Sequence, residues 1–342
     1  MTDYSQQLEQ TAKAMVAQGK GILAIDESFP TIEKRFKTIG IESTEENRRA
    51  YRDLLITNPG SAEYISGIIL FDETIRQATS DGIPFSKVLI DQGIMPGIKV
   101  DKGAKDQAGR PGEKVTEGLD GLRERLAEYR ELGAKFAKWR AVITIGEGIP
   151  TDGCIHANAH ALARYAALCQ EAGIVPMVEP ETLMDADNSI DVCYDVTEKT
   201  LNSLFSELDN QGVTIEHTIL KVNMVVSGKL CPEQAGVEEV AEKTVKCLKA
   251  TVPSSLAGIV FLSGGQSAEL ATAHLNAMNA ANPDLPWPLS FSYGRALQEP
   301  CLNAWAGKTE NVGAAQKALL HREKCNGLAC SGKYTQDMEN TA

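Results

Sequence analysis

Eight short apolar segments, helical patterns between them, and charged residues that follow the segments at similar spacing predict an α/β protein. We expect a (β/α)8 TIM barrel, with one domain over residues 1–342 and its core at residues 15–335. A chain of 342 residues can form a barrel of this kind without a second domain. An open, doubly wound sheet is the alternative architecture, since the sequence does not show closure.

The expected strands are runs rich in aliphatic and β-branched residues. They are nearly continuous in apolar character instead of alternating, which is typical of strands covered on both faces in a parallel sheet. In chain order they occupy residues 21–25, 64–71, 94–100, 136–145, 174–181, 214–225, 258–262 and 288–293.

Helical patterns fill most of the intervals. Ser43 and Glu46 have capping-box spacing before an apolar helix. Apolar residues at 119, 122, 126 and 129 step by three and four, and Gly133 is placed to end that helix. Further helices are expected at 154–172, at 237–250 and after Gln266. One or two more begin near Glu299, and a polar tail at 330–342 is expected to be mobile.

Composition excludes several function classes. The net charge is −12 with a pI near 5.0, so neither nucleic acid nor an acidic membrane is expected as a partner. The apolar runs are too short to cross a bilayer, and the polar start of the chain has no signal or transit character. Eight scattered cysteines form no C-x-x-C pair. The chain is therefore expected to be soluble, cytoplasmic and reduced.

Charged residues mark the ends of the expected strands. From Lys99 the steps to Lys138, Glu179, Lys221 and Ser263 are 39, 41, 42 and 42 residues, about one strand–helix unit each. A single charged residue at a strand end usually just meets solvent. Repetition in phase indicates instead that these side chains meet at the carboxyl end of the barrel, where barrel enzymes build their sites.

Lysines, arginines and carboxylates that converge in this way favour a particular chemistry. Excess positive charge suits phosphate groups. A lysine within an apolar strand and beside another cation has its ammonium form disfavoured, which favours attack on a ketone. A neighbouring carboxylic acid can move protons during imine formation. Ser263-Gly264-Gly265 and Gly294-Arg295 follow the last two strands, where barrels often bind phosphate.

Two other readings have little support. His156 and His160 have helical spacing but no intervening metalloprotease glutamate, so a solvated helix face is favoured over a zinc site. Gly19-Lys20-Gly21 nearly matches a dinucleotide fingerprint, yet it precedes a strand instead of following one.

The segments GKGILAIDES, TEENRRAYRDLL, GIKVDKG, FAKWRAV, LARYAALCQ, IVPMVEPE, TILKVNMV, FLSGGQS, FSYGRAL and ACSGKYT resemble class I fructose-bisphosphate aldolases. The likeness runs from about residue 15 to about residue 335. It implies reversible cleavage of fructose 1,6-bisphosphate, with neither metal nor other cofactor, and a homotetramer. A non-catalytic scaffolding protein on the same fold, or another Schiff-base barrel aldolase, remains the alternative. Sedoheptulose 1,7-bisphosphate is a second possible substrate.

Carried over to matching positions, the resemblance implies that Lys221 forms the Schiff base. Glu179 is then the acid–base that dehydrates the carbinolamine, with Lys138 and Glu181 beside it, and Asp26 accepts the C4-hydroxyl proton. The residues implied in phosphate binding are Ser263, Gly264, Gly265 and Arg295 for the 1-phosphate, and Lys99, Arg140, Ser28 and Thr31 for the 6-phosphate.

Three departures from the family pattern are visible. Phe29-Pro30-Thr31 stands where Thr-Gly-Ser is usual, which is expected to stiffen this loop and alter the 6-phosphate contacts. Val222 replaces a common proline, a change that we expect to be tolerated. The sequence ends at Ala342 without the terminal tyrosine of many relatives, so either turnover is slower or another group or water protonates the enamine.

Overall fold

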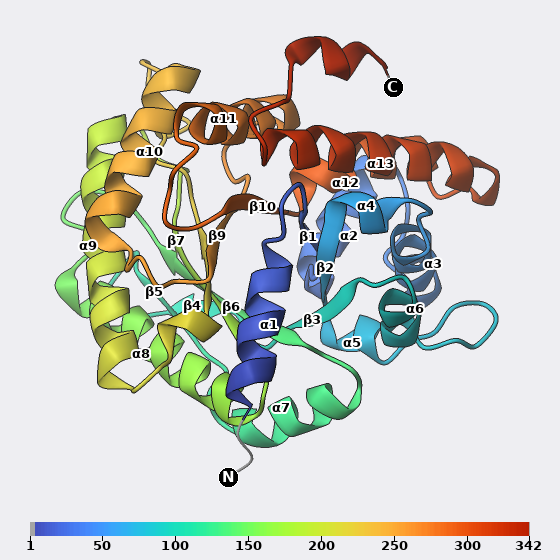
Figure 1. Ribbon diagram of the computed structural model, residues 1–342, viewed down its shortest axis with the longest axis horizontal. Helices are drawn as coiled ribbons and strands as arrows, with labels where there is room; N and C mark the ends of the chain where they lie inside the picture. Colours follow the sequence, from blue (N-terminus) through green and yellow to red (C-terminus); the bar gives the residue numbers. More distant parts are fainter. Residues whose placement is uncertain (1–3, 342) are drawn as a thin grey trace.

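Eight parallel strands close into a barrel in the computed structural model of this protein, which describes residues 4–341 (Figure 1). The ends of the expected range, residues 1–3 and 342, lie outside the described residues. Around the barrel the strands are β1 (Gly21–Ala24), β10 (Leu289–Tyr293), β9 (Gly258–Phe261), β8 (Ile219–Val222), β7 (Val175–Thr182), β6 (Phe136–Ile143), β3 (Met95–Lys99) and β2 (Ile65–Leu70). The predicted (β/α)8 barrel is thereby confirmed, and the open sheet is excluded.

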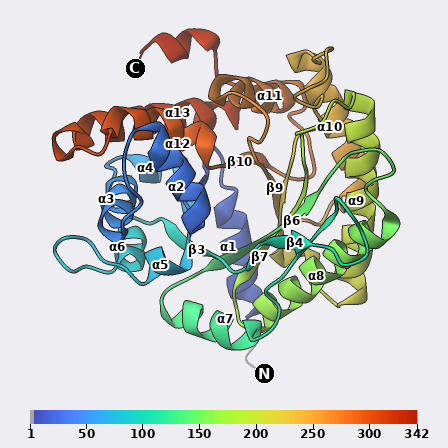
Figure 2. The ribbon, with the colours of Figure 1, turned by 180° about the vertical axis from the view of Figure 1, so that it is seen from behind.

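Helices surround the barrel, and the first of them lies across one of its ends (Figures 1 and 2). They are α1 (Ser5–Met15), α2 (Phe29–Thr38), α3 (Glu45–Ile56), α4 (Ser61–Tyr64), α5 (Asp72–Ile75), α6 (Phe85–Asp91), α7 (Leu122–Glu131), α8 (Asp152–Glu171), α9 (Ile190–Asn210), α10 (Val237–Thr251), α11 (Ala268–Ala281), α12 (Arg295–Trp305) and α13 (Val312–Ala329). Three 3-10 helices are η1 (Ile215–His217), η2 (Thr309–Asn311) and η3 (Gln336–Thr341). Within residues 4–341, no helix combines the length and apolar character needed to span a bilayer.

Helix α1 covers the amino end of the barrel. Its buried residues Leu8, Ala12 and Met15 pack in one cluster with Phe136 and neighbouring strand residues. The Phe136 ring fills the barrel interior so closely that a Cβ atom at Gly97 would lie 2.2 Å from Cζ of the ring. Only glycine fits there. Because this end is plugged, the opposite end is the one left for a site.

Some local predictions were wrong in detail. The cap of α3 is Thr44, whose hydroxyl accepts from the Asn47 N–H, and not Ser43. The strand expected over residues 214–225 is shorter, because η1 precedes it and irregular backbone follows Val222. The last helical region begins at Arg295, before Glu299. Helix α9 and the hairpin of β4 (Ala104–Asp106) and β5 (Lys114–Thr116) had not been located.

The described part of the C-terminal tail packs against two helices. The Tyr334 ring is buried, and the Tyr334 N–H donates to Asn276 Oδ1 on α11 at 2.9 Å. Glu339 pairs with Arg322 on α13. Mobility of residues 330–342 stays a prediction, but these contacts place the tail on the body of the protein.

A carboxyl group is buried where α13 meets α4. Glu323 is fully buried, and Ser61 Oγ donates to its Oε2 at 2.7 Å, while no hydrogen-bond partner from residues 4–341 reaches its Oε1. Burial raises the pKa of Glu323 to about 8, and the hydrogen bond from Ser61 opposes this shift only in part. The folded protein therefore keeps Glu323 protonated at a pH where the unfolded chain has ionised it.

We expect Glu323→Gln to be more stable than the wild type at pH 8 by roughly 4 kcal/mol, since the raised pKa costs folding stability as pH rises from about 4.5 to about 8. The advantage should shrink toward zero at pH 4.5. Urea unfolding of both proteins at these pH values measures it, with the exposed Glu310→Gln as control. A difference that does not change with pH would contradict the assignment.

Candidate active site

The carboxyl ends of the strands open into a cleft of about 1210 Å³. Every site residue predicted from the sequence lines it: Asp26, Ser28, Thr31, Lys99, Lys138, Arg140, Glu179, Glu181, Lys221, Ser263, Gly264, Gly265 and Arg295. By contrast, His156 and His160 lie on α8 and face Glu207 from a partly exposed surface. The structure therefore brings the predicted site residues together at one end of the barrel, as expected from the sequence.

Strand register brings these side chains together. Lys99 on β3 lies beside Lys138 on β6, and Arg140 on β6 lies beside Glu179 on β7. Alternation along a strand sends residues two apart to the same face, so Lys138 and Arg140 both point into the cleft, as do Glu179 and Glu181. Parallel strands thus bring lysines, an arginine and carboxylates to the same end of the barrel.

A chain of four ionisable groups runs across the floor of the cleft. Lys221 Nζ lies 3.1 Å from Glu179 Oε1, and Lys138 Nζ lies 3.3 Å from Glu179 Oε2. Lys138 Nζ also lies 2.6 Å from Asp26 Oδ2. The side chains of Lys221, Lys138 and Glu179 are at most 6% exposed. The charges of two lysines and two carboxylates therefore neutralise one another at a site that is almost fully buried from solvent.

Electrostatics favours the ionised carboxylates. Burial opposes the charge on Asp26, but Lys138, Lys221 and Lys99 outweigh it and lower its pKa to about 2. Burial opposes the charge on Glu179 too, and Lys138, Lys221 and Arg140 nevertheless lower its pKa. For Lys138, burial works against the ammonium, yet Asp26 and Glu179 raise its pKa. Asp26 and Glu179 are thus both ionised in the resting site.

One side of the cleft carries cations and hydroxyl groups. Lys99 Nζ lies 2.7 Å from Asp101 Oδ1, and Arg140 pairs with Glu181. Ser28 and Thr31 sit at the start of α2, with their hydroxyl oxygens 3.2 Å apart. Phe29 and Pro30 form the first turn of α2 and not a loop, since proline fits the first turn of a helix. The loop expected at this position is therefore a helical turn, and stiffening of the segment stays a prediction.

Another part of the cleft is formed by the glycine loop after β9. Gly265 has φ +79°, and a Cβ there would lie 3.1 Å from Met184 Sδ, so glycine is required. Arg295 NH2 donates to the Gln266 carbonyl at 3.0 Å, which joins the loop to the start of α12. The buried His274 ring holds the Gln266 side chain, with Nδ1 2.6 Å from Oε1.

A buried network behind Asp26 was not predicted. Glu27 accepts hydrogen bonds from Arg35, from Arg52 NH2 at 2.6 Å and from Gln298 Nε2 at 2.7 Å. Gln298 also donates to the Ala24 carbonyl at 2.6 Å. This network anchors the end of β1 and so holds Asp26 in place. The acidic pair Asp26-Glu27 was visible in the sequence, but its partners lie far along the chain and have no local pattern.

Fold and site together define a barrel enzyme whose mouth is built for an anionic substrate, with a buried lysine beside a carboxylate. The family model described as "Fructose-bisphosphate aldolase class-I" matches residues 7–342. The chain belongs to the class I fructose-bisphosphate aldolase family. It is thus a lyase of the Schiff-base class that reversibly cleaves fructose 1,6-bisphosphate to dihydroxyacetone phosphate and glyceraldehyde 3-phosphate.

Individual relatives agree along almost the whole chain. A probable fructose-bisphosphate aldolase class 1 of Xanthomonas campestris pv. campestris is 66% identical, over 96% of this chain and 98% of its own length. The fructose-bisphosphate aldolase of Dictyostelium discoideum is 54% identical, over 97% and 94%. A solved structure of the Plasmodium falciparum fructose-bisphosphate aldolase, in complex with TRAP and a small-molecule inhibitor, superposes with a TM-score of 0.96 at 50% identity, over 98% of this chain and 97% of that one.

Proposed function

We propose that Lys221 is the residue that forms the Schiff base and that Glu179 is its proton-transfer partner. The observation that carries this assignment is the 3.1 Å separation of Lys221 Nζ and Glu179 Oε1 on the cleft floor. Glu179 takes a proton from the Lys221 ammonium, and the freed amine attacks the substrate ketone. The proton on the attacking nitrogen passes to the new alkoxide, which gives the carbinolamine. The protonated Glu179 then gives its proton to the departing hydroxyl, so that water leaves and the iminium forms.

Asp26 carries out the cleavage step in this scheme. Its carboxylate accepts the C4-hydroxyl proton, the C3–C4 electron pair moves into the iminium to form the enamine, and the aldehyde product leaves. A pKa of about 2 keeps Asp26 ionised throughout the working pH range. Lys138 neutralises Asp26 and Glu179 together, and Glu181 holds Arg140, so both are positioning residues.

The two sides of the cleft are proposed to hold the two phosphates. Ser263, Gly264, Gly265 and Arg295 receive the 1-phosphate through backbone N–H groups and a guanidinium. Lys99, Arg140, Ser28 and Thr31 receive the 6-phosphate. Both sides lie in one cleft, with the Lys221–Glu179 pair on its floor.

A comparison of two substrates tests this polarity. We expect Arg295→Ala to raise KM roughly 30-fold for fructose 1,6-bisphosphate and for fructose 1-phosphate alike, since both carry the 1-phosphate. Lys99→Ala should raise KM for the bisphosphate only. Lys87→Ala, on the outer helix α6, is the control. If Lys99→Ala weakened both substrates equally, the assignment of the two ends would be wrong.

Three finer points extend the proposal. A cleft of about 1210 Å³ has room for one more carbon, so sedoheptulose 1,7-bisphosphate is proposed as a second substrate, to be tested by kcat/KM for both sugars. The family resemblance supports a homotetramer, which sedimentation equilibrium would measure. A cytoplasmic location is proposed from the same resemblance, with cell fractionation as its test.

A further inference from the structure

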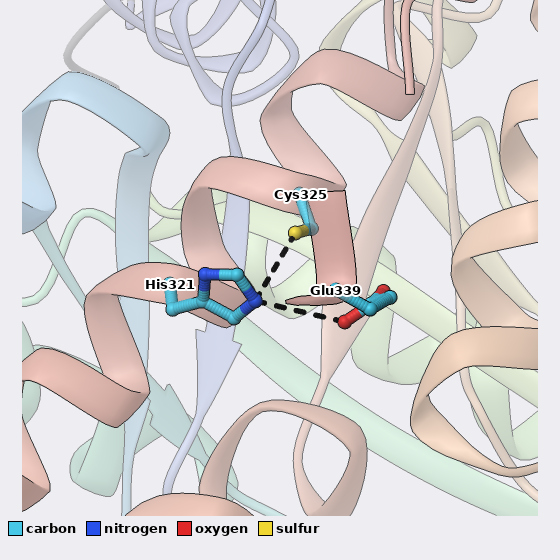
Figure 3. A group of neighbouring side chains, drawn as sticks. All are labelled: His321, Cys325 and Glu339. Atoms are coloured by element: carbon cyan, nitrogen blue, oxygen red, sulfur yellow. Dashed lines mark hydrogen bonds and ion pairs between the residues drawn. The ribbon is translucent and has the colours of Figure 1, made fainter. Parts of the chain in front are cut away.

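Three metal-ligand side chains meet far along the chain from the catalytic residues, at the C-terminal tail (Figure 3). His321 and Cys325 project from α13, and Glu339 comes from η3. His321 Nε2 lies 3.8 Å from Cys325 Sγ and 3.6 Å from Glu339 Oε2. The three ligand atoms all lie within 4.8 Å of one another. An imidazole and a thiol from α13 and a carboxylate from η3 thus lie close together.

Helix geometry and the folded tail produce this cluster. His321 and Cys325 are four residues apart, which puts them one above the other on the same face of α13. Glu339 returns to that face because Tyr334, buried against α11, turns the tail back over the helix. Cys325 is 2% exposed, while the side chains of His321 and Glu339 are 16% and 17% exposed. The cluster is therefore sheltered but reachable from solvent.

The spacing is close to that of a tetrahedral zinc site. Zinc bonds of about 2.3 Å to sulfur and about 2.0–2.1 Å to nitrogen and oxygen separate tetrahedral ligands by about 3.4 Å (N to O) and about 3.5 Å (N to S). The separations of 3.6 and 3.8 Å from His321 Nε2 are within a few tenths of an ångström of these values. Cys325 Sγ and the Glu339 oxygen lie within 4.8 Å of each other, so side-chain rotation must bring that pair closer on binding. Mixed nitrogen, sulfur and oxygen donors suit a borderline-soft ion such as Zn²⁺ better than Mg²⁺ or Ca²⁺.

Neighbouring groups already hold the Glu339 carboxylate. Tyr334 OH donates to Glu339 Oε1 at 2.8 Å, and Arg322 pairs with Oε2. Arg322, a residue of α13, is itself held by hydrogen bonds to α11: its NH2 donates to Thr272 Oγ1 at 2.6 Å and to the Ala268 carbonyl at 3.1 Å. Outer hydrogen bonds of this kind orient ligands in metal sites. Arg322 also competes for Oε2, so an ion must share this oxygen with the guanidinium through its second lone pair.

We propose that His321, Cys325 and Glu339 bind one Zn²⁺ ion, with water in the fourth position, and that the ion fastens η3 to α13. The site is separate from the aldol chemistry, since none of its ligands lines the catalytic cleft. It is expected to stabilise the tail and to have no part in carbon–carbon bond cleavage.

Cobalt spectroscopy of the full-length protein tests the proposal. After dialysis against EDTA, one equivalent of Co²⁺ should produce the visible bands of a four-coordinate ion and a thiolate-to-cobalt charge-transfer band, and Zn²⁺ should displace both. Cys325→Ser should abolish the charge-transfer band. Cys325→Ser, His321→Gln and Glu339→Gln should each weaken Zn²⁺ binding at least about tenfold. Cys231→Ser and His160→Gln, which remove a thiol and an imidazole outside the cluster, should leave binding unchanged.

Tail docking provides a second measurement. Lys333 is exposed, and trypsin cleavage after it should slow when Zn²⁺ is added to the wild type but not to Glu339→Gln. Absence of the charge-transfer band in the wild type, or equal Zn²⁺ affinity in Glu339→Gln and the wild type, would overturn the proposal. The Glu339 variant keeps the test valid if substitution of the buried Cys325 impairs folding. Aldol activity should be the same with EDTA and with Zn²⁺, which separates this site from the catalytic one.

Discussion

Lys221→Met is expected to lower kcat for cleavage of fructose 1,6-bisphosphate by roughly 10⁴-fold or more. Methionine is similar in length to lysine and fills the buried position, but it has no amine to attack the ketone. Without the iminium, the C3–C4 electron pair has no acceptor. The steady-state rate of triose phosphate formation measures the loss.

Lys229→Met is the matched control, because Lys229 also lines the cleft but pairs with Asp185 at 2.5 Å, away from the lysine–glutamate floor. It should keep most of the activity. Urea unfolding of both variants separates a catalytic loss from a folding defect. Activity in a folded Lys221→Met protein above about one hundredth of the wild-type rate would rule out Lys221 as the Schiff-base residue.

Asp26→Asn is expected to lower kcat by roughly 10³-fold while imine formation survives. The asparagine amide can occupy the place of the carboxylate but cannot accept the C4-hydroxyl proton. Lys221 and Glu179, which form the imine, remain in contact at 3.1 Å. Reductive trapping of dihydroxyacetone phosphate should therefore proceed in a variant that hardly cleaves the bisphosphate.

The low pKa of Asp26 adds a pH criterion. Its base form is lost only as pH falls toward about 2, so wild-type kcat should show no acidic limb from Asp26 between pH 5 and pH 9. Asp185→Asn, which removes the ion-pair partner of the cleft residue Lys229, is the control for a lost carboxylate. If Asp26→Asn lost imine trapping together with cleavage, Asp26 would be acting in Schiff-base formation and not in bond breaking.

Local patterns were sufficient to predict the barrel. The strand expected at 21–25 is β1, Gly21–Ala24, and that expected at 288–293 is β10, Leu289–Tyr293. Strands covered on both faces need continuous apolar sequence, which is easy to detect. The β4–β5 hairpin could not be found, because each strand has three residues and β4 is exposed. The shift from Ser43 to Thr44 as cap depends on backbone angles, since both residues carry a suitable hydroxyl.

The cleft was predictable for a related reason. A parallel barrel places the carboxyl ends of all its strands at one rim. Charged residues at those ends, such as Lys99 and Lys221, therefore converge whatever their separation in sequence. Contacts that this convergence does not explain were not predicted. Glu27 meets Gln298 across 271 residues, and Glu339 meets His321 through a folded tail. Such pairs depend on how helices pack, and one sequence contains no period that reveals them.

Borohydride reduction of the wild-type protein with dihydroxyacetone phosphate in EDTA, followed by peptide mass mapping, tests the central assignment most directly. We expect one stable adduct, located on Lys221, and undiminished aldol activity in EDTA before reduction. An adduct on another lysine, or no adduct with activity abolished by EDTA, would contradict the Lys221 Schiff-base mechanism.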